Sequence, residues 1–158
     1  MADEESNSQG LAQATLSALT HESPAVLKHL DMMQGIINRM SVNSRSCKQW
    51  CVVLIAGIFA LIAKQGSAEF AVLALFPLIL FCFLDTYYLT LERSIVDANN
   101  TFLDKLNNGK LQISDLFKVK TERKNVISSL GKTLSSLAIW PFYSLTGMMV
   151  FSAWCLAS

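Results

Sequence analysis

The chain has 158 residues, of which 52% are hydrophobic and 16% are charged, and its formal net charge is +1. This length limits the chain to about one ordinary domain, and the composition argues against a soluble one. A net charge so close to zero carries little information by itself, so the positions of the charged residues matter more than their sum.

The first residues, MADEESNSQG, are acidic and polar. A secretory signal begins with basic residues and continues into an apolar core, so this start does not resemble a cleaved signal. We predict that residues 1–23 form a flexible, acidic N-terminal tail.

A helix is expected to begin at Ser23 and Pro24, because a capping residue followed by proline is typical of a helix start. From there, apolar and small residues recur at alternating spacings of four and three. This heptad pattern predicts a cytoplasmic amphipathic helix over 24–48 that continues into the next apolar stretch. The pattern consists of Val26, Leu30, Met33, Ile37, Met40, Ser44, Cys47, Cys51, Leu54, Ile58 and Leu61.

Three uncharged apolar stretches follow, at 49–63, 70–84 and 134–157. The first two are shorter than the roughly 20 residues that cross a bilayer as a helix, so buried helices of a soluble bundle are the alternative. Aromatic residues at their ends and lysines that can reach the headgroups favour crossing. These residues are Trp50, Tyr87, Tyr88, Lys48 and Lys64. We therefore predict transmembrane helices over 49–63, 70–91 and 134–157, with an outer turn at 64–69.

The second span is also expected to continue into the cytosol, until Asn107 to Gly109 end the helix. Its heptad pattern contains Leu84, Tyr88, Leu91, Ile95, Ala98 and Phe102. Residues 92–133 then form this cytoplasmic helix and a basic loop, after which Thr121 caps a helix that enters the third span. Pro77 and Pro141 would kink or loosen the second and third spans. The predicted fold is an all-α membrane protein with three transmembrane helices, two of them extended into the cytosol as an antiparallel pair.

Lysine and arginine are distributed very unevenly around the spans. Four precede the first span, one lies between the first two, and eight lie between the second and the third. Because cytoplasmic loops carry the excess of basic residues, the N-terminus is predicted to be cytoplasmic and the C-terminus to lie outside. The expected location is a bacterial inner membrane.

Asp85 directly follows the second apolar stretch. If the first two spans are antiparallel, counting outward from the turn places Lys48 near Asp85 and Arg45 near Tyr88 to Glu92. In one interpretation Asp85 is wetted in the headgroup layer and marks the end of the span. In the other it belongs to a packed polar collar, because an acid within the membrane must be paired. Charge reversal at Asp85 or Glu92 would then disrupt assembly, and a matched reversal at Lys48 or Arg45 would partly restore it.

Small residues on the spans can let helices approach closely in lipid. Gly57, Ala60 and Gly147 are the main candidates. Packing within one chain and packing between copies are both open.

The sequence offers few candidates for a catalytic, cofactor or metal site. The sequence has no nucleotide, hydrolase or metalloprotease motif, so we predict no enzymatic activity and no cofactor. The four cysteines lack the spacing of zinc or redox sites and are interpreted as small apolar residues, although a metal or redox pair of Cys47 and Cys51 is the alternative. His21 and His29 are interpreted as surface residues rather than ligands.

A basic cluster follows the cytoplasmic helix, formed by Lys118, Lys120, Arg123 and Lys124. Next to a span, such a cluster usually orients the chain and contacts anionic lipids. Nucleic-acid binding is the alternative, but Phe117 is the one aromatic residue beside the cluster, and stacking on bases needs more.

Residues 29–64, 76–93 and 131–151 resemble the RipA-like family of small bacterial octameric membrane proteins. The residues that carry the resemblance are Gln34, Arg39, Met40, Asn43, Ser44, Lys48 and Trp50, with the stretches FPLILFCFLDTYYLTLER and GKTLSSLAIWPFYSLTGMMVF. The resemblance implies an inner-membrane homo-oligomer of eight copies and adds Arg39, Asn43 and Arg93 to the polar collar. The family is similar to pore-forming accessory proteins of RNA-targeting CRISPR systems, which implies a role in defence or stress. Other members are linked to envelope and lipid homeostasis.

Two alternative functions are therefore expected. The first is a homo-oligomeric ring or pore that changes membrane permeability. The second is a non-conducting scaffold or regulator of envelope or lipid homeostasis that recruits a cytosolic partner through the helices at 24–43 and 92–107.

Overall fold

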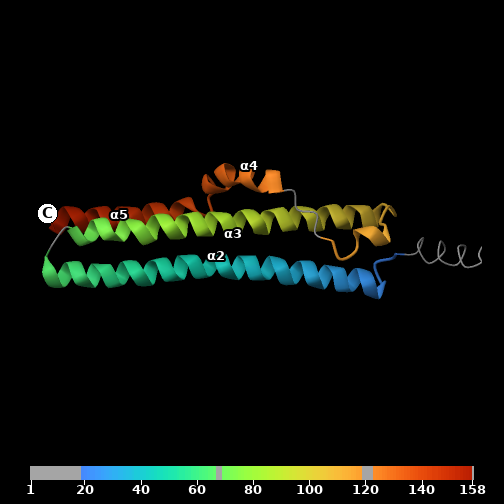
Figure 1. The fold of residues 1–158 in the computed structure, drawn as a ribbon, viewed down its shortest axis with the longest axis horizontal. Helices are drawn as coiled ribbons and strands as arrows, with labels where there is room; N and C mark the ends of the chain where they lie inside the picture. The colour runs from blue at the N-terminus through green and yellow to red at the C-terminus, as the bar shows by residue number, and fades with distance from the viewer. Residues whose placement is uncertain (1–18, 67–68, 119–122, 158) are drawn as a thin grey trace, which may run out of the picture. The chain divides into compact units, whose positions relative to one another are not determined.

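The computed structural model describes residues 19–66, 69–118 and 123–157. In these ranges the chain is all-α, with α2 (Pro24–Gln65), α3 (Glu69–Asn107), the short 3₁₀ helix η1 (Ile113–Asp115), α4 (Arg123–Leu134) and α5 (Trp140–Ala157). The two long helices α2 and α3 form an antiparallel pair, as the sequence predicted (Figure 1). The chain divides into two compact units, which we describe separately. Unit 1 contains Met1–Ile37 and Ser94–Thr121, and unit 2 contains Asn38–Arg93 and Glu122–Ser158.

Helix α2 begins at Pro24, where the sequence predicted a helix start. The carbonyl oxygen of Ser23 accepts hydrogen bonds from the backbone N–H groups of Val26 and Leu27, at 2.9 and 3.1 Å. The Ser23 hydroxyl accepts a further bond from the Thr20 N–H, at 2.9 Å. Proline at the first helical position loses nothing, because its missing N–H would have no partner within the helix.

The buried stripe of α2 follows the predicted heptad pattern as far as Cys51 and then departs from it. Beyond Cys51 the buried residues are Ile55 and Ile62, whereas Leu54 and Leu61 are 46% and 42% exposed. The prediction was wrong there because a straight α-helix has 3.6 residues per turn, so its buried face drifts away from a strict seven-residue repeat.

Helix α3 ends where the sequence predicted, at Asn107. Gly109 has a φ of 63°, a left-handed conformation that glycine adopts without strain. The N–H of Lys110 bonds to the carbonyl of Lys105, and that of Gly109 to the carbonyl of Leu106, at 2.9 and 3.1 Å. This pair of bonds is a Schellman motif, which satisfies carbonyl groups at the end of the helix.

The C-terminal part of unit 2 differs from the sequence prediction. We expected one helix to run into the third span, but α4 ends at Leu134 and α5 begins at Trp140. Turns that include Ser136 to Ile139 join them, with a backbone bond of 3.0 Å between these two residues. Pro141 therefore lies in the first turn of α5, where it is tolerated, rather than at a kink inside a span.

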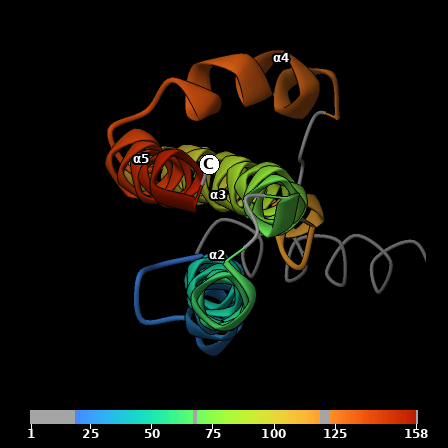
Figure 2. The same ribbon diagram turned by 90° about the vertical axis from the view of Figure 1, so that its left-hand side faces the viewer.

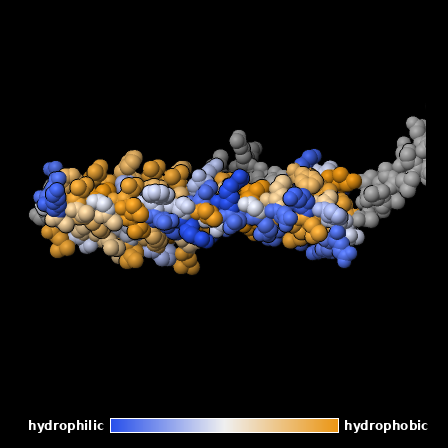
Figure 3. Space-filling view, turned by 90° about the horizontal axis from the view of Figure 1, so that it is seen from below, coloured by the Kyte–Doolittle hydropathy of each residue, from blue (hydrophilic) through white to orange (hydrophobic). Residues whose placement is uncertain are grey.

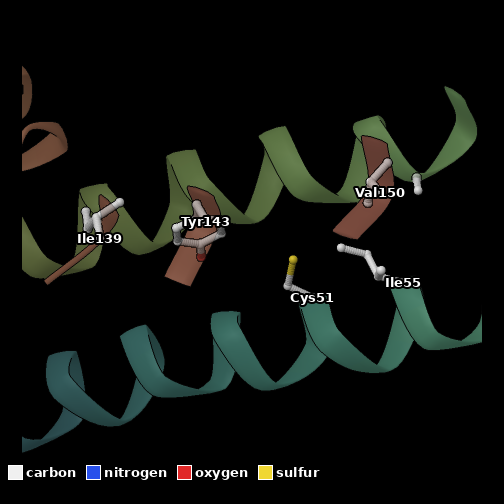
Figure 4. Close-up of a cluster of buried hydrophobic side chains, with 6 residues drawn as sticks. Cys51, Ile55, Ile139, Tyr143 and Val150 are labelled. Carbon is white, nitrogen blue, oxygen red and sulfur yellow. The ribbon is translucent and has the colours of Figure 1, made fainter. Parts of the chain in front are cut away.

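The core of unit 2 lies where three helices meet. Cys51 and Ile55 of α2 pack with Ala74 of α3, with Ile139 in the turn before α5, and with Tyr143 and Val150 of α5. Figure 4 shows five of these side chains, those of Cys51, Ile55, Ile139, Tyr143 and Val150, gathered in this core. Helix α5 lies beside α3, and α4 lies over them on the side away from α2 (Figure 2).

Unit 1 has a smaller core of its own. It contains Val26 of α2, Phe102 and Leu106 of α3, and Leu111 and Leu116 of the segment that follows. The segment after α3 therefore folds back and packs its apolar residues against the helix pair. The sequence predicted a basic loop there but gave no indication of this packing.

Two of the described helices, α2 and α3, are long and apolar enough to cross a membrane. On α2 the uncharged stretch extends from Lys48 to Lys64, and on α3 it extends from Glu69 to Asp85. Each stretch spans about 24 Å as a helix. The charged residues at the ends of these two stretches therefore bound apolar segments of equal length.

Candidate functional site: a buried acid–base cluster

Asp85 is the most unusual residue of unit 2, because a carboxylate stands in a helix face that is otherwise closely packed. Its side chain has no exposed surface. Burying a charged carboxylate is costly unless a group of opposite charge and hydrogen-bond donors surround it. The structure provides such groups from α2, and a tyrosine of α5 bonds to α3 one turn away.

Helix α2 supplies two of these groups from positions four residues apart, which lie on one face of a helix. The ammonium group of Lys48 lies 2.5 Å from Oδ2 of Asp85, and the Lys48 side chain is 26% exposed. The hydroxyl of Ser44 donates a hydrogen bond to Oδ1 of the same carboxylate. Each carboxylate oxygen therefore has its own partner on α2.

Helix α5 supplies the third group. The hydroxyl of Tyr143 donates a hydrogen bond of 3.0 Å to the carbonyl oxygen of Phe81, one turn before Asp85 on α3. Phe81 and Asp85 are four residues apart on α3, so this bond brings Tyr143 to the same part of that helix. Tyr143 thus connects α5 to the cluster, and we name Ser44, Lys48, Asp85 and Tyr143 the Asp85 cluster.

Three other buried polar side chains of unit 2 are threonines that bond to their own helices. Thr86, Thr90 and Thr146 donate to the carbonyl oxygens four residues before them, each at 2.7 Å. Hydroxyls bonded in this way add no polar surface to the packed interior. Within the described part of unit 2, the Asp85 cluster is therefore the one buried ionic group.

The structure brings together Lys48 and Asp85, as counting from the turn predicted. Tyr88 and Glu92 are half-buried, and Arg45 is exposed. Among the described residues, Arg45 and Glu92 form no ion pair with each other. Of the predicted polar collar, Lys48 and Asp85 therefore form a buried ion pair, and Arg45, Tyr88 and Glu92 are not part of it.

The remaining predicted members lie outside the cluster. Arg39 is exposed and Asn43 is half-buried. Arg93 is exposed, and its guanidinium group donates a hydrogen bond of 2.8 Å to the Ser136 hydroxyl, in the connection between α4 and α5. Arg93 thus ties α3 to that connection.

The predicted basic cluster is described only in part. Lys118 is exposed in unit 1 and lines a hollow of about 90 Å³ with His29, Lys105 and Asp115, among others. Lys120 lies outside the described residues, as do the side chains of Arg123 and Lys124.

Two members of the Asp85 cluster were not predicted from the sequence. Ser44 was predicted only as a position of the heptad pattern, although a serine four residues before Lys48 shares its helix face. Tyr143 lies far from Asp85 in sequence, and no local pattern connects the two residues.

His29 was also misjudged as a surface residue. It is 1% exposed, and its ring centroid lies 4.1 Å from that of Phe102. Its Nδ1 accepts a hydrogen bond of 2.9 Å from the backbone N–H of Phe117, so the imidazole holds the segment after α3 against α2. Burial lowers the pKa of His29. The prediction failed because a single histidine in an amphipathic pattern gives no indication of which side it faces.

The small residues predicted to pack helices have different surroundings. Gly147 of α5 is close to Leu78 of α3, whose Cδ2 would lie 3.8 Å from a Cβ at that position. Gly57 and Ala60 of α2 are exposed, and no atom within the described chain would lie within 4 Å of a Cβ at Gly57. Among these three small residues, Gly147 is thus the one that α3 packs against within the described chain.

Within the described residues, no group of three or more histidine, cysteine, aspartate or glutamate side chains could hold a metal ion. Comparison of the chain with protein-family models, curated proteins and solved structures finds no match.

Proposed function

We propose that the protein is an integral membrane protein in which α2, α3 and α5 cross the bilayer, with the Asp85 cluster at the cytoplasmic boundary. The observation that carries the proposal is the uncharged band of about 24 Å on both long helices. On α2, the lysines at the two ends of this band can reach the headgroups and so extend it toward the full thickness of a bilayer. Near the cluster, Trp50, Tyr87 and Trp140 are 60%, 40% and 59% exposed. Exposed aromatic rings of this kind favour the membrane interface.

The outer surface of unit 2 supports the same proposal. Large apolar side chains of the three helices are exposed there, including Phe76 at 71%, Leu145 at 63% and Phe151 at 63%. On the face that α2 presents, apolar side chains gather over the end that includes Gln65 (Figure 3). Such a surface is unfavourable in water and favourable against lipid tails. The experiment that tests this is membrane extraction: the protein should stay with the membrane after an alkaline wash and leave it with detergent.

We further propose that the protein acts as a homo-oligomer, with eight copies as the family resemblance suggests. Unit 1 exposes Leu27, Ile113 and Phe117 at 51%, 50% and 55%, outside the apolar band. These residues give copies of the chain apolar contacts in the cytosol. The mass of the detergent-solubilised protein tests the number of copies.

The working hypothesis for activity is that the oligomer changes membrane permeability. Thr86 and Thr90 bond to their own helix, and Asp85 is paired with Lys48, so these polar groups are not free to line a path within one chain. A permeation path would therefore run between copies. Purified protein in liposomes should then dissipate an ion gradient. The same closure favours the second candidate, a non-conducting scaffold that recruits a cytosolic protein through unit 1. Retention of a stoichiometric partner without ion flux would support the scaffold.

A further inference from the structure

The face of unit 2 shared by α3, α4 and α5 contains an apolar groove of about 490 Å³. Its walls include Leu78, Cys82 and Thr86 of α3, Leu130 and Leu134 of α4, and Tyr143 of α5. A second hollow, of about 300 Å³, shares Cys82, Leu134 and Tyr143 with it and extends to Trp140. Both volumes fall within the range of about 300 to 1,000 Å³ that is typical of ligand sites.

The two hydroxyl groups among the groove residues named above already have partners. The Thr86 hydroxyl donates to the Cys82 carbonyl at 2.7 Å, and the Tyr143 hydroxyl donates to the Phe81 carbonyl at 3.0 Å. A ligand in the groove therefore meets hydrocarbon surface rather than free hydrogen-bonding groups. This environment fits an alkyl chain better than a polar metabolite.

A positive charge stands beyond one end of the groove. Arg93 follows Thr86 by seven residues on the same face of α3, which places its backbone about 10 Å further along the helix. Its guanidinium group bonds to Ser136, two residues after the groove residue Leu134. This bond uses one of the five N–H donors of the exposed Arg93 side chain, and within the described residues the others have no partner.

We propose that this groove binds one acyl chain of an anionic phospholipid whose phosphate is held by Arg93. An apolar groove with an arginine whose backbone lies about 10 Å further along the helix matches a lipid, in which a charged phosphate lies a short distance from the hydrocarbon. The orientation agrees with the charges of α3, because Arg93 lies on the cytoplasmic side of Asp85 in the proposed topology. This inference rests on the membrane location proposed above.

Gly131 offers a way to fill the groove without disturbing the backbone. It lines the groove on α4, and no atom of the described chain would lie within 4 Å of a Cβ added there. The Gly131→Trp variant therefore places an indole in the space of the acyl chain. Leu73→Trp is a matched control, since Leu73 of α3 is 56% exposed and is not among the residues that line the grooves described here.

The experiment counts the lipids that remain on the purified protein by native mass spectrometry, after exchange into equal amounts of phosphatidylglycerol and phosphatidylcholine. We expect one tightly held phosphatidylglycerol per protomer for the parent protein and for Leu73→Trp, and none for Gly131→Trp. Arg93→Gln should retain a lipid but prefer phosphatidylglycerol about tenfold less, because a charge-assisted hydrogen bond to the phosphate is lost. Equal lipid retention by Gly131→Trp, or an unchanged preference in Arg93→Gln, would overturn the proposal.

A second measurement uses the unmodified protein, in case Gly131→Trp does not fold. Phosphatidylglycerol with a photoreactive diazirine in its acyl chain should label 78–86 of α3 and 130–134 of α4 more strongly than the surface around Leu73. Uniform labelling of the apolar surface would contradict a specific groove while leaving membrane insertion intact. If the protein is instead water-soluble without detergent, the proposed membrane location itself fails.

Discussion

The ammonium group of Lys48 lies 2.5 Å from Oδ2 of Asp85, a side chain with no exposed surface. Removing one partner of a buried pair leaves the other charge uncompensated and costs about 3 to 5 kcal/mol. We therefore expect Lys48→Met to lower the free energy of unfolding by about this amount. The measurement is a denaturant titration of the detergent-solubilised protein. The double variant Lys48→Met, Asp85→Leu should recover most of the loss, and a loss of the same size in the double variant would contradict a direct pair.

Charge reversal distinguishes the buried pair from the rest of the predicted collar. Asp85→Lys should abolish the native oligomer, because two ammonium groups would meet in the interior. Glu92→Lys should have a much smaller effect, since Glu92 is half-buried and has no ion-pair partner among the described residues. Size-exclusion chromatography of both variants compares them directly. Equal disruption by the two would show that the collar extends beyond Lys48 and Asp85.

Tyr143 joins α5 to the carbonyl oxygen of Phe81 with a hydrogen bond of 3.0 Å. Tyr143→Phe keeps the ring in the core but removes this donor, so we expect a loss of about 1 kcal/mol in the free energy of unfolding. Tyr87→Phe is the matched control, because the Tyr87 side chain is 40% exposed. A loss of the same size in both variants would argue that the hydroxyl of Tyr143 does not stabilise α5.

His29 should make unit 1 sensitive to acid. Burial lowers the pKa of His29 from its ordinary value of 6.5, and its Nδ1 must be unprotonated to accept the bond from Phe117. The stability contributed by the neutral ring is therefore present above about pH 6.5 and is lost as the pH falls through the folded-state pKa. The basic Lys105 and Lys118 and the acidic Asp115 line the same hollow as His29.

The check is the thermal midpoint of the parent protein and of His29→Gln between pH 7.5 and pH 5. We expect the midpoint of the parent to fall more steeply with acid than that of the variant. Parallel curves would show that this imidazole does not contribute to the pH dependence.

Asn99 carries a buried oxygen without a hydrogen-bond partner in the described chain. Its side chain is 7% exposed, and Oδ1 is the unpaired atom. Replacing an unsatisfied polar group with an apolar one of similar size can stabilise a protein, so Asn99→Leu should raise the free energy of unfolding by about 1 kcal/mol. A clear loss in the purified oligomer would instead indicate that Asn99 bonds to another molecule.

The sequence predicted the long helices well because their signals are local. Pro24 marks the start of α2, and Gly109 follows the end of α3, each through the conformation that its own backbone prefers. The pair of Lys48 and Asp85 could also be predicted, since two antiparallel helices with a short turn fix which residues share a level.

The contacts that depend on packing between distant segments could not be predicted. Tyr143 reaches the Asp85 cluster because α5 lies beside α3, and His29 is buried because the segment around Phe117 folds back over it. The separation of α4 from α5 was missed as well, because Ser135, Ser136 and Pro141 lie within a long uncharged apolar stretch and were not interpreted as a helix boundary.

The most direct test of the account is the position of the two ends of the chain. A fluorescent protein that matures only in the cytoplasm would be fused to the N-terminus, and a phosphatase active only outside the membrane to the C-terminus. We predict that both reporters are active and that the protein stays with the membrane fraction after an alkaline wash. Reporters that place the two ends in one compartment, or a chain released by the wash, would contradict three crossings by α2, α3 and α5.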